Sequence, residues 1–111
     1  VGIHPYEMLK KEEGLKQRLR NLLGANYKLF MNNWEVAGEI EKHGDVLFAE
    51  GCMAHSCTVE ESLLAIDTSK GVIYCAIMSD SLGSKFKTFS ESNGSLPPVM
   101  RERMKEIEGM K

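Results

Sequence analysis

Hydrophobic residues near both ends of the chain recur at helical spacing. In the first third, one apolar stripe at positions i, i+4, i+7 and i+8 consists of Leu15, Leu19, Leu22 and Leu23, and Gly24 follows it as a stop signal. Toward the other end, Pro97 and Pro98 begin a segment with Met100, Met104 and Ile107 on one side. Each pattern predicts an amphipathic helix whose apolar face lies in the core.

The middle of the chain alternates short apolar runs with turn-forming residues. This pattern predicts five strands, at residues 36–42, 46–50, 62–67, 72–78 and 85–90. The connections are too short for crossover helices, so neighbouring strands should be antiparallel. Lysines in the last strand indicate that it lies at an edge of the sheet. The predicted fold is α+β: an antiparallel five-stranded meander sheet with the N- and C-terminal helices packed on it.

Length and composition indicate one globular domain spanning residues 1–111. The 42% hydrophobic and 27% charged content is ordinary for a soluble protein, and the length leaves no room for a second core. The net charge is −2 and no Lys/Arg run is interleaved with aromatics, so we expect no nucleic-acid partner, whereas a basic protein partner is acceptable. No apolar stretch is long enough to span a bilayer.

The candidate chemistry lies in the segment Cys52-Met53-Ala54-His55-Ser56-Cys57. Of the three cysteines, Cys75 sits inside an apolar strand, where a thiol behaves as a small hydrophobe, so Cys52 and Cys57 are the natural pair. A ring this small stabilises a protein by only about 2 kcal/mol, so a bridge here would serve mainly to fix the shape of a loop. Such a loop pushes its middle residues outward and presents the imidazole of His55.

Other interpretations of the segment stay open. Cys52, His55 and Cys57 are zinc-ligand residue types, but structural zinc takes four ligands and this spacing matches no usual finger. A redox motif would place its cysteines closer together at a helix start. In the simplest case, His55 is a polar residue of an exposed turn without a partner.

An enzyme is the rival from another class. His55 would then pair with one of the nearby acidic residues, Glu50, Glu60, Glu61 or Asp67. The chain has no glycine-rich phosphate loop, no nucleophile elbow and no paired metal ligands. We therefore expect no catalytic residues, no cofactor and no metal site.

Three stretches together resemble the inhibitors of vertebrate lysozyme (Ivy) from bacterial cell envelopes. They are Gly51 with the segment that follows it, the strand ending Ala65-Ile66-Asp67 before a turn closed by Gly71, and the apolar strand 72–78. Looser similarity extends to residues 22–27 and 96–98. In that family the segment reads C-K-P-H-D-C, its cysteines are bridged, and its histidine enters the lysozyme cleft and bonds to the catalytic carboxylates. The resemblance implies a Cys52–Cys57 disulfide and His55 as the inserted group.

The segment departs from the family pattern on both sides of the histidine. Met53 and Ala54 replace Lys-Pro, and Ser56 replaces Asp. Without the proline the loop must lose more conformational freedom on binding, and without the two charges it loses contacts at the rim, so affinity should fall. We expect Met53, Ala54 and Ser56 to contact the partner around His55.

The sequence thus predicts a lysozyme-inhibitor-like binding protein with a protein partner, a lysozyme being the first candidate. The alternative is an envelope domain of the same fold that does not inhibit lysozyme and binds an unknown partner. Homodimer formation stays open. The chain opens at Val1 without a methionine or signal sequence, as a processed chain would, so the expected periplasmic or secreted location depends on the cysteines.

Overall fold

The computed structural model describes residues 13–53, 59–79, 85–92 and 94–109. In chain order its elements are α2 (Glu13–Leu23), η1 (Gly24–Asn26), α3 (Tyr27–Asn32), β1 (Val36–Ala37), β2 (Glu41–His43), β3 (Val46–Cys52), β4 (Glu61–Asp67), β5 (Val72–Met78), β6 (Lys87–Ser90) and α4 (Pro98–Gly109). The predicted α+β class, with helices before and after the sheet, is confirmed.

All the strands belong to one antiparallel sheet. The strand order is β1-β3-β4-β5-β6, and β2 pairs with β3 on the same side as β1. Consecutive strands from β3 to β6 are neighbours, as the short connections require, so the predicted meander is confirmed. β6 lies at the edge opposite β1, also as predicted.

The predicted strand at residues 36–42 is wrong in one respect, because the structure divides it into β1 and β2. Ala37 is opposite Gly51, but Glu41 is opposite Phe48, so residues 38–40 face only two residues of β3. One extra residue on one side of an antiparallel pair is a β-bulge, which interrupts pairing and bends the strand. Ile40, 4% exposed, enters the core at the bulge. Within the described residues the sheet therefore has six strands, where five were predicted.

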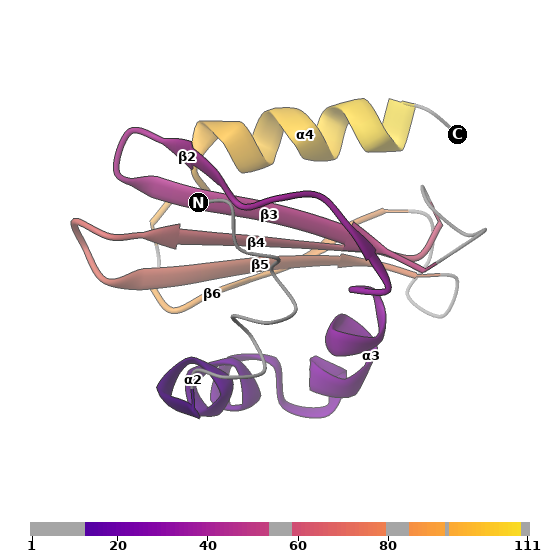
Figure 1. Cartoon of the computed structure of the whole chain (residues 1–111), viewed down its shortest axis with the longest axis horizontal. Helices are drawn as coiled ribbons and strands as arrows, with labels where there is room; N and C mark the ends of the chain where they lie inside the picture. Colours follow the sequence, from indigo (N-terminus) through magenta and orange to yellow (C-terminus); the bar gives the residue numbers. More distant parts are fainter. Residues whose placement is uncertain (1–12, 54–58, 80–84, 93, 110–111) are drawn as a thin grey trace.

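Each face of the sheet is covered by helices (Figure 1). α2 and α3 pack on one face, and α4 packs on the other. The core on the α2 and α3 side includes Leu19, Leu23, Phe30, Trp34, Leu64, Ile73 and Ile77. The core on the α4 side includes Phe48, Leu63, Tyr74, Met78, Met100 and Ile107. Both predicted helical stripes thus lie in the core, against opposite faces.

An ion pair holds α2 against the end of the sheet where β5 begins and β6 ends. Arg18 Nε donates to Glu91 Oε2 at 3.0 Å, and Glu91 Oε1 also accepts the backbone N–H of Ile73 at 2.9 Å. A second Arg18 nitrogen donates to the carbonyl of Gly71 at 2.6 Å. The hydrogen bond from Arg18 is the main reason that the pKa of Glu91 is lowered in the folded protein.

Replacing Glu91 should make the free energy of unfolding less dependent on pH in the acidic range. The pKa of Glu91 is lower in the folded protein than in the unfolded chain, where a glutamate has a pKa of about 4.3. The ionised carboxylate therefore contributes its full stabilisation above the unfolded-state pKa, and this stabilisation is lost as the pH falls through the folded-state pKa. The free energy of unfolding of the wild type should therefore fall more steeply between about pH 5 and pH 3 than that of Glu91→Gln. Urea unfolding at several pH values measures this, with Glu102→Gln at an exposed position of α4 as the control. Parallel curves for wild type and Glu91→Gln would contradict it.

Candidate functional site

The predicted recognition loop starts where β3 ends. Cys52 is the last residue of β3 and is buried, and Met53 follows it with 38% of its surface exposed. Cys52 is opposite Glu61 in the sheet, and the N–H of Met53 donates to the carbonyl of Glu60 at 3.2 Å. Both ends of the connection are therefore held together by backbone pairing. The remaining predicted contact residues, Ala54, His55 and Ser56, lie outside the described residues, as does Cys57.

Close packing behind the end of β3 holds this base in place. A Cβ atom on Gly51 would lie 2.6 Å from the carbonyl oxygen of Asn33 and 2.6 Å from Cε3 of Trp34, so only glycine fits here. On the neighbouring strand, the hydroxyl of Ser62 donates to the carbonyl of Phe30 at 2.9 Å. Since Ser62 is opposite Gly51, α3 and the chain after it support both strands at the point where the connection leaves the sheet.

Two apolar side chains are exposed at the same place. Val36 is 49% exposed and Met53 is 38% exposed, and they are the large hydrophobic residues exposed among those that the structure describes. Val36 is opposite Cys52 in the pairing of β1 with β3, and Met53 follows Cys52 in the chain. The base of the connection therefore offers an apolar rim, made of Val36 and Met53, that water covers in the free protein.

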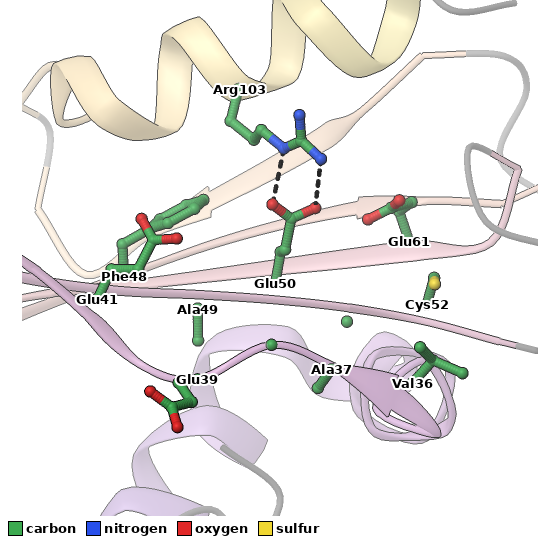
Figure 2. Close-up of a pocket in the computed structure, with 12 residues that line it drawn as sticks. Val36, Ala37, Glu39, Glu41, Phe48, Ala49, Glu50, Cys52, Glu61 and Arg103 are labelled. Carbon is green, nitrogen blue, oxygen red and sulfur yellow. Dashed lines mark hydrogen bonds and ion pairs between the residues drawn. The ribbon is translucent and has the colours of Figure 1, made fainter. Parts of the chain in front are cut away.

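A groove of about 400 Å³ runs from this base along the bulged edge of the sheet, under α4. Figure 2 shows Arg103 reaching from α4 toward Glu50 on β3, with Cys52 and Glu61 toward one end of the groove and Phe48 and Glu41 toward the other. Its lining consists of Val36, Ala37, Gly38, Glu39, Glu41, Phe48, Ala49, Glu50, Gly51, Cys52, Glu61 and Arg103.

The Arg103–Glu50 ion pair crosses this groove. Arg103 Nε donates to Glu50 Oε1 at 2.7 Å, and Nη2 donates to Oε2 at 3.0 Å, which is the two-pronged geometry that suits a guanidinium and a carboxylate. The hydrogen bond to Glu50 is the main cause that raises the pKa of Arg103, against the opposing effect of burial. Nothing in the sequence indicates this pair, because its members are 53 positions apart.

Two of the carboxylates considered as partners for a catalytic His55 are engaged elsewhere. Glu50 binds Arg103, as described. Asp67 accepts hydrogen bonds from the hydroxyl and N–H of Ser69 and the N–H of Lys70, and the Ser69 hydroxyl is the main cause that lowers its pKa. Asp67 also lies at the far end of β4, about 20 Å along the strand from the loop at roughly 3.3 Å per residue. These two residues therefore have structural roles.

Cys75 is a free, fully buried cysteine, as the sequence predicted. It lies in the middle of β5, and burial away from water raises the pKa of its thiol. The described residues contain no group of three or more His, Cys, Asp or Glu side chains placed to hold a metal ion. None of the described helices is long and apolar enough to cross a membrane.

Comparison with known families finds a match that covers most of the chain. A family model described as "Inhibitor of vertebrate lysozyme (Ivy)" matches residues 14–109. The matched range contains the whole sheet, the segment between Cys52 and Cys57, nearly all of α2 and all of α4. No curated protein and no solved structure matches the chain.

The packing behind the loop base leads to a test with a matched control. Gly51→Ala should lower the free energy of unfolding by about 1 to 3 kcal/mol, because the new methyl group overlaps the Asn33 carbonyl and the Trp34 ring. Gly38→Ala, in the bulge of the same edge, adds a methyl group in open space and should change stability much less. Urea unfolding followed by the fluorescence of Trp34 measures both variants. Equal urea midpoints for Gly51→Ala and Gly38→Ala would contradict the tight packing around Gly51.

Proposed function

Because the chain belongs to the family of inhibitors of vertebrate lysozyme, we propose that it binds a lysozyme and inserts His55 into the active-site cleft of that enzyme. The observation that carries the proposal is the place of the segment containing His55. It connects β3 to β4, and both ends of this connection are fixed by the pairing of Cys52 with Glu61 and of Met53 with Glu60. A segment leaving the sheet at such a base is suited to entering a cleft on another protein.

The inhibition proposed here follows from the chemistry of glycosidases. These enzymes use two carboxyl groups, one as an acid and one as a base or nucleophile. An imidazolium placed between them forms charge-assisted hydrogen bonds to both carboxylates. Catalysis needs one of the two carboxyl groups protonated and the other ionised, and the imidazolium prevents this difference. His55 supplies the imidazole, and the inhibitor itself performs no reaction.

We propose that a Cys52–Cys57 disulfide closes the loop. One fact on the described cysteines supports this pairing: Cys75 is a buried free thiol, which leaves Cys52 and Cys57 as the remaining pair of the three cysteines. A closed loop has fewer conformations before binding, so ordering His55 in the cleft costs less free energy. A disulfide also persists best in an oxidising compartment, which supports a periplasmic or secreted protein.

The residues beside His55 are proposed to contact the partner mainly through apolar and small groups. Met53 is exposed at the base of the loop, and Val36 lies close by with 49% of its surface exposed. Removing apolar surface from water is favourable by about 25 cal/mol per Å², before the entropic costs of association are subtracted. Met53, Ala54 and Ser56 replace charged or rigid residues of the family pattern, and these replacements weaken binding. Burial of the apolar side chains of Met53 and Val36 offsets part of that loss.

These same replacements favour a second candidate function. An envelope domain that keeps the fold but recognises another protein would also retain the loop base and the rim of Val36 and Met53. In that case His55 contacts a partner other than a lysozyme. Inhibition of cell-wall lysis separates the two candidates directly.

Removal of the His55 imidazole tests the proposed inhibition directly. His55→Ala should weaken binding to a susceptible lysozyme by about 2 to 5 kcal/mol, since truncating one member of a buried charged pair leaves the other unpaired. Calorimetric titration and a cell-wall lysis assay measure this, and the thermal midpoint should stay near that of the wild type. His4→Ala is the matched control, because it removes the same side chain outside the range of the family match. If the wild type at micromolar excess slows none of several vertebrate lysozymes, the envelope-domain candidate replaces the inhibitor.

A count of free thiols tests the proposed disulfide. Alkylation of oxidatively purified protein under denaturing, non-reducing conditions should label one thiol, and peptide mapping should place the label on Cys75. Reduction before alkylation should raise the number of labelled thiols to three, the full cysteine count. Three labels without reduction would exclude the bridge.

A further inference from the structure

We propose that the groove beside the loop base receives an arginine or lysine side chain of the same protein partner that the loop contacts. The proposal goes beyond insertion of His55, and it rests on the proposed function for the identity of that partner. The groove is the one of about 400 Å³ that lies between α4 and the bulged edge of the sheet.

The shape of the groove suits a long side chain with an aliphatic stem. Its walls are largely apolar, with Val36, Ala37, Phe48 and Ala49 along the strands. The bulge creates the space, because residues 38–40 are not paired with β3 there and Ile40 turns into the core under α2 and α3. Lysine and arginine bury their methylene stems along such apolar surface while their charged ends reach polar groups.

The charge of the groove selects a cation. Glu39, Glu41, Glu50 and Glu61 line it, against the single guanidinium of Arg103, so the lining carries a formal charge of −3. The whole chain carries only −2, so the remainder of the protein is on balance slightly positive. The negative charge is therefore concentrated in this groove, and a basic partner is drawn to this side of the molecule.

Arg103 shows that the groove accommodates a guanidinium. Its two-pronged bond to Glu50, with N···O distances of 2.7 and 3.0 Å, is formed on the α4 side (Figure 2). Glu39 and Glu41 also line the groove, and both are exposed. They point to different sides of the strand in Figure 2, and Glu41 Oε1 lies 2.8 Å from Nε2 of His43. An incoming cation reaches both carboxylates without displacing Arg103, and at Glu41 it competes with His43.

The groove is also continuous with the proposed loop interface. Cys52 and Val36 form part of its lining and belong to the base from which the loop leaves the sheet. A partner that takes His55 into its cleft thus lies beside the open end of the groove. The occupant that fits is a basic residue on the rim of that cleft.

A peptide experiment tests the groove without a lysozyme. Blocked tri-arginine, titrated into the full chain at low ionic strength, should shift backbone NMR signals of β1, β2 and α4, and tri-glutamate should not. The double variant Glu39→Gln/Glu41→Gln should bind tri-arginine about threefold to tenfold more weakly, as expected for the loss of two exposed ion pairs. Asp45→Asn is the matched control, since it removes an exposed carboxylate at the hairpin turn, the other end of β3. Shifts that persist unchanged in the double variant would overturn the proposal.

Binding to a vertebrate lysozyme separates failure of this inference from failure of the proposed function. The double variant should slow association with lysozyme about threefold to tenfold at low salt, and the difference should shrink as salt screens the charges. If His55→Ala weakens lysozyme binding but the double variant associates like the wild type, the groove inference fails and the inhibitor function stands. If tri-arginine binds through Glu39 and Glu41 but lysozyme does not bind at all, the groove is a basic-residue site and the inhibitor function fails.

Discussion

Strands β4 and β5 carry apolar side chains on both faces, so water must be excluded from both sides of the sheet. α2 and α3 cover one face and α4 covers the other, each with the apolar stripe visible in its sequence. Hydrophobic burial of this kind is the main favourable term in folding. The other features follow from it: α3 must lie under the end of β3, and α4 must pass over the edge that contains the bulge. Those two contacts define the base of the loop and the wall of the groove.

Patterns that depend on local periodicity were sufficient to predict most of the fold. The leucine stripe ending at Gly24 and the apolar strand 72–78 match the observed elements closely. The antiparallel arrangement followed from connection length alone. The bulge could not be predicted, because residues 36–42 read as one extended run and the register is set by β3, a separate segment of the chain. The division of the helices between the two faces is likewise decided by tertiary packing.

The candidate site was predictable in part. The segment with His55 stood out through its cysteines and its resemblance to a family, and the structure adds the paired base from which it leaves the sheet. Residues that act through distant partners were missed. Glu50 and Arg103 are each ordinary charged residues in their own segments, and only packing of α4 over β3 brings them together. The exposure of Val36 could not be predicted either, because a valine at a sheet edge has the same local sequence pattern as a valine in a buried strand.

The burial of Cys75 in the middle of β5 has a consequence for the order of events during folding. Three thiols allow three different pairings, and the two that use Cys75 are incompatible with the sheet, because its side chain is enclosed in the core between the strands and α2 and α3. An oxidant that acts before β5 is in place therefore traps chains that cannot complete their core. Rapid assembly of the sheet protects against this outcome, since it removes Cys75 from thiol exchange. If the proposed Cys52–Cys57 bridge forms, a substitution that slows assembly of the sheet should reduce the yield of correctly oxidised protein more than it reduces the stability of the molecules that fold.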